Sequence, residues 1–133
     1  LAIQKATVLE PGNSSYHLIF SRVLKRLGKL NRAEKEAGLA IKHSARPSAS
    51  LFNHRAWIKW SKKDYRGALE DWKSAISLSP KAASYYARSA EAHYRLAEWS
   101  RAADCYKKAM SLDPKNKKYR KRYKQIIDQY KED

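Results

Sequence analysis

The feature that most constrains this sequence is a repeat of 34 residues. Pro80 and Pro114 are 34 positions apart, and the segments that end at them align residue by residue. Aromatic and small residues recur at matching places. The matched pairs are Phe52 and Tyr86, Ala56 and Ala90, Tyr65 and Trp99, Ala68 and Ala102, Trp72 and Tyr106, Ala75 and Ala109, and Leu78 and Leu112. Because a unit this short cannot bury its own apolar face, the period predicts units that stack into a shared core.

Each of the two clearest units is expected to form two antiparallel helices. In the unit 49–82, Phe52, Ala56 and Trp60 follow helical spacing, and a turn at 62–64 leads into a second apolar series. Proline cannot continue a helix, so the second helix should end before the closing proline. The unit 83–116 repeats the pattern. We refer to the two helices of a unit as its first and second helix.

Two earlier segments extend the array. Residues 14–48 form a degenerate unit, in which the small residues stay in phase although Ala45 replaces the closing proline. Residues 1–13 look like the second helix of a further unit, because Ala6 and Pro11 have the alanine-to-proline spacing of the later units. We expect the missing first helix to lie upstream; the alternative is that another element covers this end.

The last segment, 117–133, is expected to form a capping helix with one apolar face and one polar face. Its charge is uneven, since residues 115–133 hold eight Lys or Arg and three acids. The expected apolar stripe consists of Tyr119, Tyr123, Ile126, Ile127 and Tyr130.

The period, the phased small residues and the closing prolines resemble the tetratricopeptide repeat. The resemblance implies an all-α fold, a right-handed α-solenoid of antiparallel helix pairs with about three repeats, a preceding half repeat and a C-terminal capping helix. It also implies that the first helices line a concave groove that grips a ligand.

Mapped onto this sequence, the family's ligand positions give a basic and aromatic groove. Arginine and aromatic side chains are common anchors of recognition, and arginine can hold a carboxylate through two hydrogen bonds. The expected partner is therefore a protein with an acidic segment or a free C-terminal carboxylate. Protonation of the one groove histidine could add charge. The expected binding residues are Arg22, Lys25, Arg26, Asn53, His54, Trp57, Trp60, Arg88, Tyr94, Arg95, Lys118, Lys121 and Arg122.

Within the family, the sequence distantly resembles co-chaperone domains that clamp the acidic C-terminus of heat-shock chaperones. The clamp is incomplete in both registers, so another acidic partner is favoured over a chaperone tail. The register from Ser14 places Leu18, Arg22, His54, Ser84 and Arg88 at the clamp positions, where only Arg88 fits. The next register places Asn53, Trp57, Arg88, Lys118 and Arg122, where only the last two fit.

The formal net charge of +16 favours anionic partners. It leaves RNA or single-stranded nucleic acid as the alternative ligand of the groove, because phosphates attract cations and aromatic rings stack on bases. A diffuse solvated coat of charge is a further alternative. Contact of residues 115–124 with an anionic membrane is less favoured than a solubilising cap.

The sequence offers no catalytic or metal-binding motif. One cysteine, Cys105, excludes a disulfide framework within the chain, and the clustered acids Asp64, Glu70 and Asp71 are expected at a turn and on a surface helix face. No apolar run reaches the roughly 18 residues that a membrane span needs. We expect a non-catalytic scaffold without cofactor or metal, in an intracellular setting, cytoplasmic or nuclear, with the oligomeric state left open.

Overall fold

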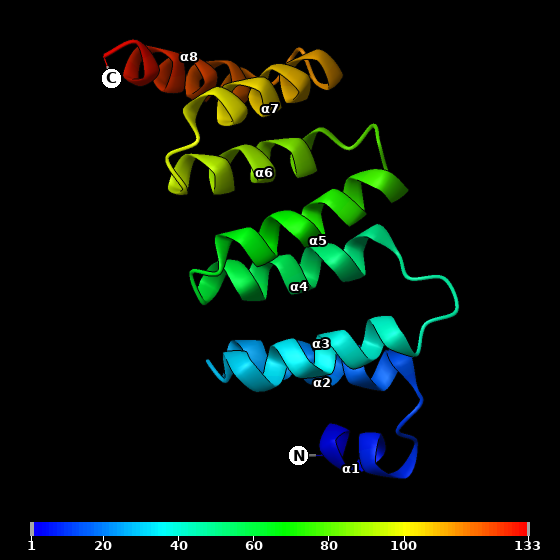
Figure 1. Cartoon of the computed structure of the whole chain (residues 1–133). Helices are drawn as coiled ribbons and strands as arrows, with labels where there is room; N and C mark the ends of the chain where they lie inside the picture. Colours follow the sequence, from blue (N-terminus) through cyan, green and yellow to red (C-terminus); the bar gives the residue numbers. More distant parts are fainter. Residues whose placement is uncertain (1, 133) are drawn as a thin grey trace.

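The computed structural model describes residues 2–132 and contains only α-helices there. Figure 1 shows them stacked in chain order, with the two termini at opposite ends of the stack. The prediction of an all-α fold is therefore confirmed. Leu1 and Asp133, which the sequence assigns to the two end helices, lie outside the described residues. The helices are α1 Ala2–Leu9, α2 Ser14–Arg26, α3 Leu30–Lys42, α4 Ala49–Ser61, α5 Tyr65–Leu78, α6 Ala83–Arg95, α7 Trp99–Leu112 and α8 Lys117–Glu132.

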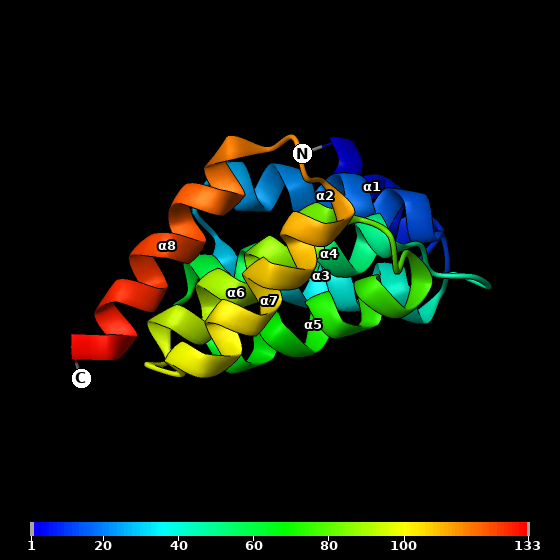
Figure 2. The same cartoon turned by 90° about the horizontal axis from the view of Figure 1, so that it is seen from above.

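Packing follows the order of the chain. The most extensive contacts join α2 with α3, α4 with α5, and α6 with α7, and each pair then packs against the next helix along the chain. Figure 2 looks down this stack from the α8 end. Contacts of this kind between neighbours along the chain define an α-solenoid.

The turn inside each pair has the same backbone geometry. Gly28, Lys63 and Ala97 have φ values of 76°, 64° and 59°, in the left-handed region. Glycine adopts this region without steric cost, whereas for lysine and alanine the left-handed backbone is strained. The turn between α2 and α3, which belongs to the degenerate unit, is therefore the least strained of the three.

Small residues form much of the core. An alanine with no exposed surface lets neighbouring helices approach closely, and a larger side chain there would overpack the core. Trp72 is also fully buried. The phased alanines with 0% exposure include Ala56, Ala68, Ala75, Ala90, Ala102 and Ala109.

One expectation about the acidic residues was wrong. Asp64 and Glu70 are exposed as predicted, and Asp64 accepts a hydrogen bond from the backbone N–H of Gly67 at the start of α5. Asp71, however, is only 2% exposed. Its carboxylate accepts hydrogen bonds from Arg55 at 2.8 and 2.9 Å and lies 3.1 Å from Lys59. Two cations on α4 thus make its burial tolerable.

Candidate functional site

Two hollows lie next to each other along α4, on the side of the molecule that α2, α4, α6 and α8 contribute to. We call this side the groove face. The basic pocket, of about 300 Å³, is lined by Arg22, Lys25 and Arg26 of α2 and His54 of α4. The aromatic pocket, of about 250 Å³, is lined by Trp57, Trp60, Trp72, Ser84, Ala87, Arg88, Glu91, Tyr106 and Tyr119.

The basic pocket owes its charge to the helical period. Arg22, Lys25 and Arg26 are spaced i, i+3 and i+4, which puts them on one face of α2. No ion pair with an acidic side chain involves these three cations anywhere in residues 2–132. Partial burial lowers the pKa of Lys25. The pocket therefore holds concentrated positive charge that the protein itself does not neutralise.

His54 is neutral in this pocket. Burial, together with the charges of Lys25 and Arg22, lowers its pKa to about 4. The Ser21 hydroxyl donates its proton to the Ala33 carbonyl at 2.7 Å, so His54 Nε2 must donate to Ser21 Oγ at 2.8 Å. The expected gain of charge by protonation of His54 does not occur near neutral pH, because burial and the neighbouring cations oppose it.

Three tryptophans build the wall of the aromatic pocket. Trp57 meets Trp72 edge to face with ring centroids 5.4 Å apart, and Trp60 meets Trp57 at 6.0 Å in the same manner. Edge-to-face contacts between rings add stability to the fold beyond that from burying their apolar area. Trp72 is fully buried, while Trp57 and Trp60 are half-buried and border the hollow.

Arginine side chains lie over these rings. The Arg88 guanidinium carbon lies 5.3 Å from the Trp57 ring centroid, and that of Arg95 lies 5.5 Å from the Trp60 centroid. Arg88 Nη1 also donates to Asn53 Oδ1 at 2.8 Å. The same oxygen accepts from Trp72 Nε1 at 2.9 Å. Asn53 thus fixes the arginine and the tryptophan in place.

An internal carboxylate occupies the far side of the aromatic pocket. Arg122 Nε and Nη2 donate to Glu91 at 2.8 and 3.0 Å, and the Tyr106 hydroxyl donates to the same carboxylate at 2.6 Å. The hydrogen bond to Glu91 raises the pKa of Arg122, and burial, with the help of Glu91, raises the pKa of Tyr106. Arg122 also lies 4.2 Å from the Tyr94 ring centroid. These contacts fasten α8 to α6.

The structure separates the sequence-predicted residues into groups. Four of them form the basic pocket, and Trp57, Trp60 and Arg88 line the aromatic pocket. Asn53, Arg95 and Arg122 contact residues of the aromatic pocket without lining it, and Tyr94 contacts Arg122 and Gln129 beside it. Lys118 and Lys121 are exposed on α8 and line neither pocket.

Six residues that line the aromatic pocket are not among the expected binding residues: Trp72, Ser84, Ala87, Glu91, Tyr106 and Tyr119. Trp72, Tyr106 and Tyr119 occupy positions that the repeat phase and the apolar stripe assign to packing, yet they also border the hollow. Their signal in the sequence is the concentration of aromatic residues at consecutive repeats. Because helices α4 to α8 all contribute to this pocket, residues that pack in the core also line it.

The described residues contain no group of three or more His, Cys, Asp or Glu side chains that could hold a metal ion. None of the helices in residues 2–132 combines the length and the apolar character that crossing a membrane requires.

The stacked pairs and their shared face define a helical-repeat solenoid. Residues 83–116 match the family model described as the tetratricopeptide repeat. Arrays of this family are protein-interaction scaffolds, typically without catalytic activity of their own.

Three known proteins illustrate the likeness. The heat shock protein STI1 of Saccharomyces cerevisiae is 33% identical over 78 residues, which is 59% of this chain and 13% of that protein. The chain thus matches a small part of this relative. The Arabidopsis OM64 TPR domain superposes with a TM-score of 0.76 at 22% identity, covering 87% of this chain and 95% of that one. The first TPR of Spaghetti (RPAP3), bound to the HSP90 peptide SRMEEVD, gives 0.78 at 18% identity, covering 89% and 93%. At such identities the two structures show the shared fold.

Proposed function

We propose that the groove face binds an acidic segment, or the free C-terminal carboxylate, of a partner protein. Carboxylates would enter the basic pocket, and a large apolar side chain would enter the aromatic pocket. The observation that carries this proposal is the convergence of Arg22, Lys25 and Arg26 on one hollow that contains no acidic side chain.

The energetics of the basic pocket favour an anion. Three like charges close together repel one another. Burial lowers the pKa of Lys25 and of His54, and the charges of Lys25 and Arg22 contribute to the lowering at His54. A ligand carboxylate would relieve the repulsion and form charge-assisted hydrogen bonds, which are stronger than neutral ones. Binding should therefore weaken as salt is added.

The two pockets are close enough for one short peptide. His54 and Trp57 are three residues apart on α4, a rise of about 4.5 Å. An extended peptide advances about 3.3 Å per residue, so its acidic and apolar side chains would be separated by few positions. The HSP90 peptide bound by the Spaghetti domain, SRMEEVD, combines acidic and apolar residues in this way.

Nucleic acid is the weaker candidate for this face. Single strands are held by stacking bases on open aromatic rings. Here the guanidinium groups of Arg88 and Arg95 already cover the rings of Trp57 and Trp60. An apolar peptide side chain in the remaining hollow fits the geometry better than a stacked base.

A tryptophan-fluorescence titration tests the proposal, with SRMEEVD, its C-amidated form and a scrambled neutral peptide as ligands. We expect saturable binding of the acidic peptides, and a preference for the free acid would identify end recognition. The variant Arg22→Ala/Lys25→Ala should lose about tenfold or more in affinity, because two charge-assisted contacts disappear.

The matched control is Lys107→Ala/Lys108→Ala, which removes the same charge from exposed sites on α7. It should bind within about twofold of the unmodified protein, since distant exposed charges are screened. Equal affinity losses in both variants, or none in either, would reject the basic pocket as the binding site.

A further inference from the structure

The last helix has two sides of opposite character. One side of α8 packs into the core, where Ile126 is fully buried and Tyr119 and Tyr123 are half-buried. The opposite side carries Lys117, Arg120, Lys121 and Lys124, all of which are exposed. We call these four cations the outer α8 stripe.

Helical geometry aligns the stripe. Positions 117, 120, 121 and 124 are spaced i, i+3, i+4 and i+7, so their side chains project from one face. The groove face takes a different side of α8, where Arg122 binds Glu91 and Gln129 accepts a hydrogen bond from Tyr94. The stripe and the groove face are thus separate surfaces of one helix, and α8 forms one end of the stack in Figure 1.

No acidic side chain neutralises the stripe. Among the described residues, none of its four members forms an ion pair, and Arg120 donates to the Pro114 carbonyl at 3.0 Å. Asp128, one turn beyond Lys124, is exposed and forms no ion pair with it. This contrasts with Arg55, Lys59 and Arg122, which are each held by a carboxylate.

The arrangement costs helix stability. The first turn of α8 contains no acid, and it begins with two lysines at the positive end of the helix dipole. Cations at that end destabilise a helix, and so do like charges spaced at i, i+3 and i+4. A cap needs only polarity, which mixed charges supply without this repulsion. A charge arrangement that destabilises its own helix without a structural benefit indicates a functional surface.

We propose that the outer α8 stripe binds the phosphate backbone of a nucleic acid. The four cations extend over seven residue steps, about 10 Å of helix, which matches the scale of a few successive phosphates. The stripe has no aromatic or apolar side chain, so it contacts phosphates rather than stacked bases, and it does not read sequence. For the same reason it offers a lipid bilayer no inserting side chain.

Fluorescence anisotropy with a labelled oligonucleotide of about twenty nucleotides, single-stranded and duplex, tests this inference. The stripe variant is Lys117→Gln/Lys121→Gln/Lys124→Gln. Its matched control, Lys35→Gln/Lys73→Gln/Lys107→Gln, removes three exposed lysines from α3, α5 and α7, so both lower the formal charge of +16 by three.

At about 100 mM salt we expect the stripe variant to bind at least about tenfold more weakly, and the slope of log affinity against log salt to fall by about 2–3. The control should stay within about twofold. Thermal unfolding of the stripe variant should occur at no lower temperature than that of the parent, because repulsion is removed. Its titration with SRMEEVD should be unchanged, so this test is independent of the groove.

Three outcomes would overturn the inference. Equal weakening by both variants would indicate diffuse charge. Absence of oligonucleotide binding to the parent, with binding to vesicles of phosphatidylserine and phosphatidylcholine at about 1:3, would assign the stripe to a lipid surface instead. Loss of SRMEEVD binding in the stripe variant would show that the two surfaces are not separate.

Discussion

The two pockets of the groove face use the same type of residue for different purposes. In the basic pocket, Arg22 and Arg26 face a hollow without any acidic partner in the described residues. In and beside the aromatic pocket, Arg88 is fixed by Asn53 and lies over Trp57. The first pocket has cations available to a ligand, and the second has cations committed to the fold.

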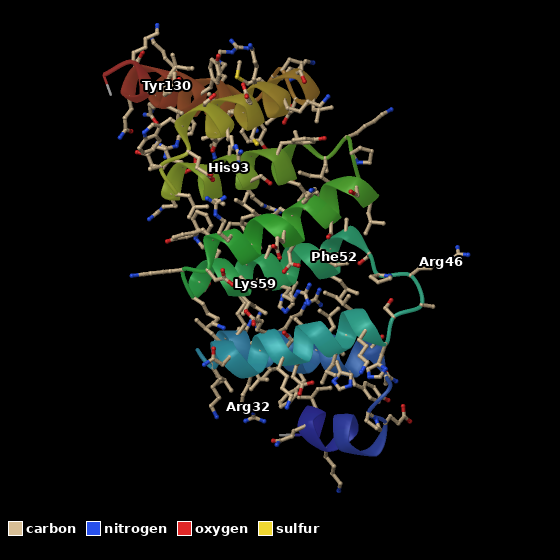
Figure 3. The ribbon with its side chains drawn as sticks, in the orientation of Figure 1. Arg32, Arg46, Phe52, Lys59, His93 and Tyr130 are labelled. Carbon is tan, nitrogen blue, oxygen red and sulfur yellow. The ribbon has the colours of Figure 1, made fainter. Side chains whose placement is uncertain are left out.

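The difference shows that the cations of this protein have different roles, some in recognition and some in stability. Figure 3 illustrates both extremes, with Arg46 extending away from the loop between α3 and α4 and Lys59 lying within the stack. Lys59 is bound to the buried Asp71, so it contributes to stability rather than recognition. Substitutions in the aromatic pocket should therefore lower the free energy of unfolding, whereas those in the basic pocket should lower affinity.

The largest effect should follow from Trp72→Ala. This fully buried ring contacts Trp57 and Trp60 and donates to Asn53, and its loss leaves a cavity. We expect the free energy of unfolding to fall by about 3–5 kcal/mol, measured by urea denaturation. A loss below about 1 kcal/mol would mean that the aromatic pocket is not a structural element.

A smaller loss is expected for Glu91→Gln. The substitution weakens the paired hydrogen bonds to Arg122 and the bond from Tyr106, but both partners of the ion pair are about 30% exposed. Because solvent screens such pairs, we expect about 1 kcal/mol of destabilisation. Glu70→Gln, at an exposed site of α5, is the control and should unfold like the parent.

The neutral His54 predicts a pH dependence of stability. Its folded pKa of about 4 lies below the ordinary value of 6.5, so the unfolded chain binds the proton more readily. The contribution of His54 is complete above about pH 6.5 and is lost as the pH falls toward 4. Between pH 6.5 and 5.5 the parent should lose about 1 kcal/mol more than His54→Gln. Parallel curves for the two proteins would contradict the neutral state of His54.

The smallest effect on stability should come from Lys25→Gln. Removing one of three crowded cations relieves repulsion, so we expect the free energy of unfolding to stay within about 0.5 kcal/mol of the parent, on the stabilising side. A clear destabilisation would erase the contrast between the two pockets. Chemical denaturation of this variant beside Trp72→Ala measures that contrast directly.

The sequence predicted the features that depend on local spacing. The helical fold follows from the 34-residue period, and the cations of the basic pocket share one helix at i, i+3 and i+4, a pattern visible without a structure. The family's ligand positions also assigned these cations and His54 to one groove, but they did not separate them from the residues of the aromatic pocket.

Features that depend on partners in other helices could not be predicted in this way. Asp71 is buried because Arg55, sixteen positions earlier, reaches it from α4. Arg122 meets Glu91 across 31 positions. His54 is neutral because it is partly buried and because cations on α2 lie beside it, both of which lower its pKa. Periodicity places each residue on a face of its own helix, but it does not tell which side chain of another helix it meets.

The order of packing gives the basic pocket a mechanical consequence. Helices contact chiefly their neighbours along the chain, so the pair α2 and α3 is joined to the rest mainly through α3 and α4. A peptide bound between α2 and α4 would bridge the two helix pairs from a second direction. The ligand would then act as a brace, which slows hydrogen exchange in α2 and α3 and makes two separately opening units unfold as one.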